Sequence, residues 1–202
     1  MKKYTLIIII FLLSISDLQS QKVLIGKTDS FKYTLIDRIN NIIYVYGDGV
    51  YKKINLDNFN VESFPLKTEK DFTLNLYTPL MVDSIPFFIH SSGGLVYEHR
   101  NDSLVRIDNS FKHVMQNYSA IFSYKSKIHR FGGYGFWSAR NFITYFDNSL
   151  TNEWEIINPE NSKEVPEESS EAKHFLINDD LYIFDSKYIN PFNRFEQLFN
   201  EK

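Results

Sequence analysis

Residues 118–157 read YSAIFSYKSKIHRFGGYGFWSARNFITYFDNSLTNEWEII, and this stretch decides the fold class. Apolar and polar residues alternate in the segments 119–124, 127–131, 142–146 and 153–157, which is the pattern of half-buried strands. Only Lys125 and Ser126 separate the first two segments, the spacing of a tight hairpin. Four short strands within about 40 residues predict one four-stranded antiparallel sheet.

The same layout occurs earlier in the chain, at 42–57 and 87–108. Each segment has an alternating strand, a bend with glycine and a second strand closing on aspartate. The closing residues Asp57, Asp108 and Asp147 lie 51 (108 − 57) and 39 (147 − 108) residues apart, the period of propeller blades. Residues 173–177 and 181–185 begin a fourth, partial unit. The chain is therefore predicted to be all-β and antiparallel, a β-propeller-like fold with units at about 24–64, 74–115, 118–158 and 171–200.

Glycine pairs and two aromatic residues give these units a finer signature. Gly132 and Gly133 end a strand, Tyr145 lies on the following strand, and Trp154 follows a polar turn. Gly93 and Gly94 occupy the same place in the second unit. The pattern resembles the kelch repeat of the kelch-type, galactose-oxidase-like propeller superfamily. That resemblance implies a tight bend at each glycine pair near the propeller centre, with Tyr145 and Trp154 packed between neighbouring blades.

The resemblance is uneven along the chain. Asp48 separates Gly47 from Gly49 in the first unit, and Asp185 and Ser186 stand in place of the glycines in the last. Kelch propellers usually close with six or seven blades, which needs about 270 to 320 residues. Three to four blades therefore predict an incomplete propeller, either a truncated product or the N-terminal part of a larger protein. A closed four-bladed ring and completion by a second chain are the alternatives.

The N-terminus has the layout of a secretory signal. Lys2 and Lys3 precede the apolar run 6–13, and the small and polar segment 14–21 follows. The run is shorter than the roughly 20 residues of a membrane-spanning helix, so cleavage after Ser20 is favoured over an uncleaved anchor. We therefore expect residues 1–20 to be a signal peptide and the mature chain to be exported, to the periplasm, the cell surface or the medium, without a stable membrane span.

Composition excludes several classes of function. The net charge is −3, from 22 basic and 25 acidic residues, and offers no basic excess for nucleic acid. There is no cysteine, which excludes disulfides, thiolate metal sites, cysteine nucleophiles and the tyrosine–cysteine crosslink of copper radical oxidases. None of the five histidines is paired at the spacing of a helical zinc motif. No metal or other cofactor is expected.

Two groups of residues are candidates for ligand binding. His129 and Arg130 end the strand before Gly132, where the resemblance implies that the chain approaches the axial face, and strand alternation places them on opposite faces of the sheet. The alternative is that both pack or bond between blades. Tyr134, Phe136, Trp137 and Arg140 follow the glycines and offer an aromatic surface with a cation, suited to a sugar ring or to a protein hot spot. Their alternative role is to seal the next blade interface.

The recurring aspartates and the acidic segment have simpler explanations. Asp57, Asp108 and Asp147 are expected to make Asx-type turns, because one active site does not need the same carboxylate in every unit. Residues 159–173 are acidic, contain two prolines and predict a loop between units.

No catalytic constellation emerges, and no catalytic residue is assigned. The sequence favours an exported, non-catalytic binding or sensing module that recognises a protein or a glycan. The enzymatic alternative is a kelch-type sugar mutarotase or epimerase, with His129, Arg130 and Arg140 as its candidates. A further alternative is the N-terminal part of a membrane-anchored sensor.

Overall fold

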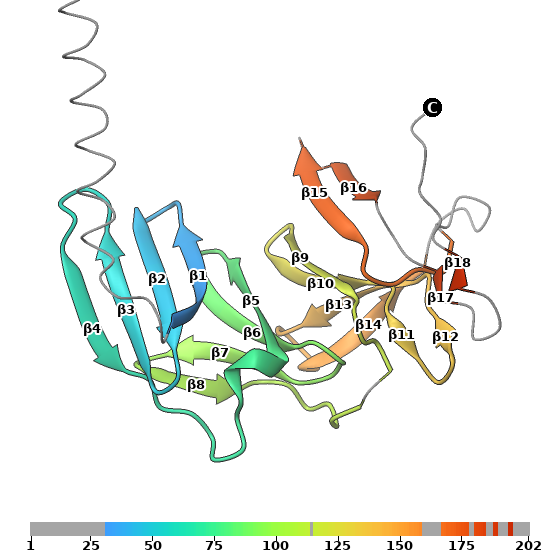
Figure 1. The fold of residues 1–202 in the computed structure, drawn as a ribbon, viewed down its shortest axis with the longest axis horizontal. Coiled ribbons are helices and arrows are strands. Elements are labelled where there is room, and N and C mark those ends of the chain that lie inside the picture. The colour runs from blue at the N-terminus through green and yellow to red at the C-terminus, as the bar shows by residue number, and fades with distance from the viewer. Residues whose placement is uncertain are drawn as a thin grey trace, which may run out of the picture.

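The computed structural model describes residues 31–113, 115–158, 167–177, 180–184, 188–189 and 194–195. The expected signal peptide, the pair Asp185 and Ser186, and most of the acidic loop 159–173 lie outside these residues. The regular secondary structure of the described chain is nearly all β strand, as predicted, and its strands form consecutive antiparallel sheets (Figure 1).

The first sheet is a meander in which each strand pairs with the next along the chain, in the order β1-β2-β3-β4. Its strands are β1 (Phe31–Asp37), β2 (Ile42–Gly47), β3 (Val50–Asn55) and β4 (Val61–Pro65). Asp48 and Gly49 form the two-residue turn between β2 and β3, where Gly47 pairs with Val50.

The second sheet repeats this order after a short 3-10 turn, η1 (Leu74–Leu76). Its strands are β5 (Tyr77–Val82), β6 (Ile85–His90), β7 (Val96–Arg100) and β8 (Ser103–Arg106). Gly93 and Gly94 lie between β6 and β7 with φ of 136° and 75°, so the bend predicted at this glycine pair is present.

The third sheet contains a small insertion. Its strands are β9 (Ala120–Tyr124), β10 (Lys127–Phe131), β13 (Ile143–Asp147) and β14 (Glu153–Ile157), so the four strands predicted in 118–157 are confirmed. The hairpin of β11 (Tyr134–Gly135) and β12 (Ser138–Ala139) is inserted between β10 and β13. The predicted turn at Lys125 and Ser126 is also present, with φ of 47° and 59° at these residues.

Two short hairpins follow the third sheet. They are β15 (Lys173–Ile177) with β16 (Asp180–Phe184), and β17 (Tyr188–Ile189) with β18 (Arg194–Phe195). The predicted strands of the fourth unit correspond to β15 and β16.

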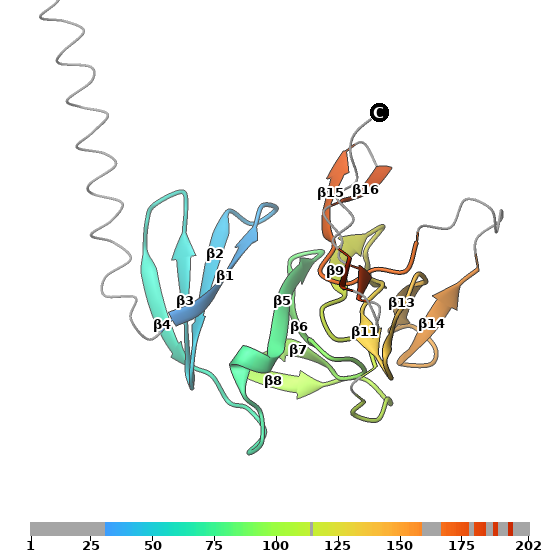
Figure 2. The same cartoon turned by 45° about the vertical axis from the view of Figure 1, so that its right-hand side comes forward.

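The first strand of each sheet faces the first strand of the next. β1 contacts β5, β5 contacts β9, and β9 contacts β15, which places these strands innermost in a propeller-like arrangement. Figure 2 shows the blue β1–β4 sheet and the green β5–β8 sheet as separate neighbouring layers. The described sheets form an open series and do not close into a barrel, so the fold is partial and propeller-like.

The core consists of three apolar clusters, one at each junction between sheets. Phe88 of β6 packs toward the first sheet with Tyr46 and Tyr51, while its neighbours Phe87 and Ile89 pack toward the third. The third cluster joins Phe122 and Phe131 to the β15–β16 hairpin. Because the second sheet is covered on both faces, the sequence of β6 is a continuous apolar run and does not alternate between apolar and polar residues.

Candidate functional site

The glycine bends lie at one common end of the sheets. Register places Gly47 opposite Phe31, His90 opposite Tyr77, and Phe131 opposite Ala120, so each second strand ends where an innermost strand begins. The turns that follow these second strands therefore share one face of the molecule, here called the glycine face. The β11–β12 hairpin begins on this face directly after Gly133.

Close backbone approach explains the glycine pair of the third sheet. Gly132 has a φ of 65°, and a Cβ atom added there would lie 2.5 Å from the carbonyl oxygen of Ser169. Gly133 has a φ of 101° and packs against the backbone of Gln116. Neither position accepts a larger residue without movement of the neighbouring chain.

Arg130 is completely buried between the second and third sheets. Its Nη2 donates a hydrogen bond of 2.8 Å to the carbonyl oxygen of His90, and its Nη1 donates one of 3.4 Å to Oε1 of Gln116. The guanidinium carbon lies 4.7 Å from the ring centre of Trp154. Burial lowers the pKa of Arg130 to about 9. These contacts hold one sheet against the next and leave the side chain inaccessible to a ligand.

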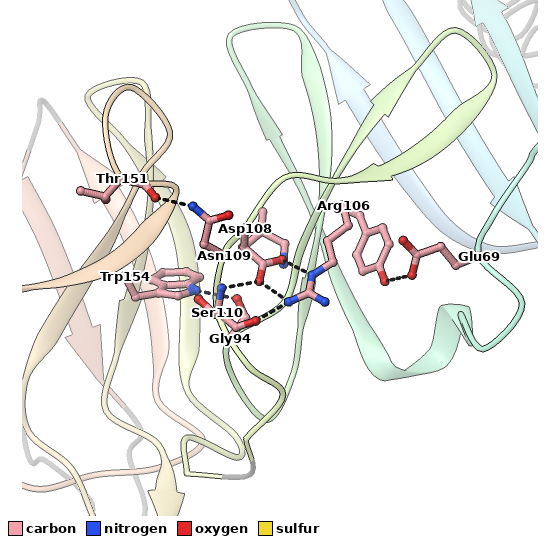
Figure 3. Close-up of polar contacts among 10 residues, drawn as sticks. Glu69, Gly94, Arg106, Asp108, Asn109, Ser110, Thr151 and Trp154 are labelled. Carbon is pink, nitrogen blue, oxygen red and sulfur yellow. Dashed lines mark hydrogen bonds and ion pairs between the residues drawn. The ribbon is translucent and has the colours of Figure 1, made fainter.

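Trp154 makes the second polar contact at this junction. Its Nε1 donates a hydrogen bond of 2.8 Å to the carbonyl oxygen of Gly94, shown in Figure 3. Nearby, Nδ2 of Asn109 donates to the carbonyl oxygen of Thr151 at 2.8 Å. Trp154 therefore lies between neighbouring sheets, as the resemblance implied for Trp154 and Tyr145, whereas the same expectation is wrong for Tyr145.

Asp108 secures the end of the second sheet beside this contact. Its buried carboxylate accepts hydrogen bonds from the backbone N–H groups of Val96 (2.7 Å) and Ser110 (3.0 Å) and pairs with Arg106 at 3.0 Å (Figure 3). Its partners confirm an Asx-type structural role.

Tyr145 does not reach the junction that Trp154 occupies. Its hydroxyl donates a 2.7 Å hydrogen bond to Oε2 of Glu155 on the adjacent strand, and the Lys127 ammonium lies 4.4 Å from its ring centre. These contacts are within its own sheet. Strand alternation directs Tyr145 to the opposite face from Phe146, which packs against the second sheet.

His129 lies on the opposite face from Arg130, as strand alternation predicted. Its ring stacks on Phe122 at 5.6 Å with an interplanar angle of 12°, and Nδ1 lies 3.2 Å from the carbonyl oxygen of Lys127. Burial lowers the pKa of His129, so the imidazole is neutral near pH 7. His129 and Arg130 thus do not share an open site.

Phe136 and Trp137 are the most accessible of the candidate residues. They form the two-residue turn of the β11–β12 hairpin, with Gly135 paired to Ser138 and with φ of 48° and 68°. Their side chains are 69% and 78% exposed. They do not seal a sheet interface, which was the alternative role considered for these rings. Type I′ turns of this kind favour Asn-Gly, and two bulky aromatic residues there are strained.

Backbone bridges hold the base of this hairpin. Asn117 pairs with Tyr134, and Arg140 pairs with Ser169. The side chains of Tyr134 and Arg140 are half-buried, and within the described ranges Arg140 has no ion-pair partner. The structure therefore brings Tyr134, Phe136, Trp137 and Arg140 together on the hairpin and its base, while His129 and Arg130 are buried in β10, the strand that precedes it.

Tyr118 is an exposed aromatic residue that sequence reasoning did not single out. It follows Asn117, is 63% exposed and has a φ of 60°. Tyr118 lies beside the hairpin because Asn117 forms a backbone bridge with Tyr134. No local sequence pattern predicts this bridge.

Comparison with known proteins identifies no family for this chain, since no family model and no curated protein matches it.

Among the residues that the structure describes, no helix has the length and apolar character needed to cross a membrane. The same residues contain no cluster of three or more histidine, aspartate or glutamate side chains arranged to hold a metal ion.

Proposed function

We propose that the chain is an exported, non-catalytic binding or sensing module of kelch-propeller type that recognises a protein or a glycan. The observation that carries this proposal is the exposed pair Phe136 and Trp137 at a strained turn. Exposed aromatic rings next to a cation are the composition of binding hot spots and of surfaces that stack on sugars. Export rests on the N-terminal sequence pattern.

The exposure of both rings at this strained turn favours a binding role over a packing role. Two non-glycine residues with left-handed backbone cost about 1–3 kcal/mol each, and the exposed rings of Phe136 and Trp137 bury little apolar area to offset that cost. A turn that served only to connect β11 to β12 would be more stable with Asn-Gly. A partner that covers both rings supplies the missing stabilisation through buried apolar area.

The geometry favours binding over sugar isomerisation. A mutarotase or epimerase needs a cation and a proton-transferring group within reach of the same substrate. His129 and Arg130 lie on opposite faces of β10 and both are buried. Only Arg140, of the three residues considered for that activity, is partly open.

Binding of the full chain to a glycan microarray and to immobilised cell-surface proteins tests this function. Trp137→Ala and Phe136→Ala should each weaken binding about tenfold or more, the size of a hot-spot loss. Leu150→Ala is the matched control, because Leu150 is 87% exposed in the β13–β14 turn, at the end of the third sheet opposite the glycine face. Equal affinities of all three variants would contradict the proposal.

An anomer-exchange measurement by nuclear magnetic resonance tests the enzymatic alternative. The binding module should leave the interconversion rate of free sugars unchanged. Catalysed interconversion that His129→Ala abolishes would replace the binding module with an enzyme.

A further inference from the structure

A cavity of about 360 Å³ lies between the first and second sheets, away from the hairpin. The first sheet contributes Tyr44, Tyr51 and Lys53 to its lining, and the second contributes Ser84, His99 and Asp102. Ser84 lies in the β5–β6 turn and Asp102 in the β7–β8 turn, at the end of the sheets opposite the glycine face. The volume is at the lower end of the range for small-molecule sites.

Lys53 supplies a positive charge to this pocket. Its ammonium nitrogen lies 5.8 Å from the ring centres of both Tyr44 and Tyr51, and 5.2 Å from that of Phe64. Lys53 forms no ion pair with any described residue. Aromatic rings hold the ammonium group by cation–π attraction without neutralising it, so a carboxylate is the complementary ligand group.

His99 forms a neutral, polar part of the wall. Its Nδ1 lies 2.8 Å from the hydroxyl oxygen of Tyr46, and the Tyr51 ring meets it edge-on with centres 4.5 Å apart. Burial and the charge of Lys53 lower the pKa of His99 to about 4, so the ring is uncharged at neutral pH. Its Nε2 is buried with no hydrogen-bond partner in the described chain, and a polar ligand atom would satisfy it.

Asp102 adds hydrogen-bond acceptors on the same side. The Tyr51 hydroxyl donates to Oδ1 of Asp102, and Oδ2 has no partner among the described residues. Asn101 lies beside it in the lining with a side-chain amide that both donates and accepts. Ser84 donates to Asp37 at 2.7 Å, which fixes its hydroxyl at the rim. Acceptors and donors spaced around an aromatic wall suit several hydroxyl groups on one small ligand.

We infer that this pocket binds a small hydroxylated carboxylate of the sugar-acid class. Lys53 pairs with the carboxylate, Asp102 and Asn101 bond to hydroxyl groups, and the Tyr44 ring lies against the apolar face of the ligand. This site does not depend on the proposed function of the hairpin, because the two lie at opposite ends of the sheets and share no residue.

Isothermal titration of the full chain with D-glucuronate and D-glucose provides the test. The two probes differ only in the carboxylate, so glucuronate should bind with a Kd of about 1 mM or lower and glucose about tenfold more weakly. Acetate should not compete with glucuronate at matched concentration. If acetate competes as strongly as glucuronate, the pocket binds anions without recognising hydroxyl groups, and the inference is overturned. The absence of glucuronate binding would overturn it as well.

Neighbouring lysines give a matched pair of variants. Lys53→Met keeps the side-chain stem but removes the charge, and it should lower the affinity for glucuronate to that for glucose. Lys52→Met is the control, because Lys52 lies on the opposite face of β3, over the Phe31 ring. Trp137→Ala should leave glucuronate binding unchanged, which separates failure of this site from failure of the hairpin. Glucuronate binding that survives in Lys53→Met would contradict the assignment.

Discussion

Nε1 of Trp154 donates a 2.8 Å hydrogen bond to the carbonyl oxygen of Gly94, 60 residues earlier in the chain. The bond joins β14 of the third sheet to the glycine bend between β6 and β7 of the second. The indole of the third sheet therefore satisfies a backbone carbonyl at the bend of the preceding sheet. The same indole ring covers the buried guanidinium of Arg130.

Trp154→Phe should lower the free energy of unfolding by about 1–2 kcal/mol, because the Gly94 carbonyl loses its donor. Urea unfolding of the full chain measures the change. Trp137→Phe, at the exposed tryptophan, is the control and should change stability by no more than about 0.5 kcal/mol. Equal effects of the two substitutions would show that the hydrogen bond of Trp154 to Gly94 does not contribute to the free energy of unfolding.

Gly132→Ala should destabilise the fold more than Gly49→Ala. The two glycines have similar φ, 65° and 71°, so both alanines carry similar backbone strain. The added Cβ at 132 would lie 2.5 Å from the Ser169 oxygen, whereas at 49 nothing lies within 4 Å. We expect an extra loss of about 1–3 kcal/mol at 132, measured by thermal or urea unfolding. An equal loss at both sites would leave backbone strain as the sole cause.

Replacing the hairpin tip by the favoured turn, Phe136→Asn with Trp137→Gly, should raise stability by about 1 kcal/mol and abolish partner binding. Unfolding and microarray binding are measured on the same protein. Lys125→Asn with Ser126→Gly is the control, since the β9–β10 turn also has left-handed backbone at both residues. It should stabilise the chain without loss of binding, and a loss there would show that binding does not depend on the tip.

Acidification should destabilise the fold through its histidines. All five have lowered pKa values, with burial as the largest cause, and that of His99 falls to about 4. The unfolded chain takes up protons near pH 6.5 while the folded chain does not, so stability falls as pH decreases from about 6.5 toward 4. Urea midpoints across this range measure the effect. His99→Gln should make the urea midpoint depend less steeply on pH. An unchanged dependence would contradict the low pKa of His99.

Alkaline conditions should also destabilise the fold. Burial raises the pKa values of Tyr46, Tyr51 and Tyr97 far above the usual 10. The unfolded chain therefore loses protons above about pH 10 that the folded chain retains, and stability falls there. Arg130 has the opposite effect, because its lowered pKa of about 9 makes the folded chain lose a proton that the unfolded chain keeps. The three tyrosines outnumber this single group. Ultraviolet titration of tyrosine should show late ionisation that coincides with unfolding, and ionisation of all tyrosines before unfolding would disagree.

The strands were predictable because their periodicity is local. The four strands in 118–157 and the turn at Lys125 follow from alternation and spacing alone. The β11–β12 hairpin was not predicted, since two residues per strand are too few to show a period. The turn after β3 also differs from the prediction, which gave Asp57 the Asx-type role. Oδ1 of Asn55 accepts hydrogen bonds from the backbone N–H groups of Asp57 (2.8 Å) and Asn58 (3.2 Å) instead. Asn and Asp side chains can both make such turns, so the sequence alone does not distinguish them.

The candidate site was predicted only in part. Alternation correctly placed His129 and Arg130 on opposite faces, but it cannot tell what covers a face. The cover of Arg130 comes from Gln116, His90 and Trp154, three separate segments. The pocket around Lys53 was missed for the same reason, because its residues belong to two sheets that meet only after folding.

The contact of each innermost strand with the next has a consequence for evolution. A sheet that depends mainly on its two neighbours can be duplicated or lost as a unit, because the new junction repeats an existing one. Along the described chain each such junction involves the same kind of element, since β1, β5, β9 and β15 contact one another in turn.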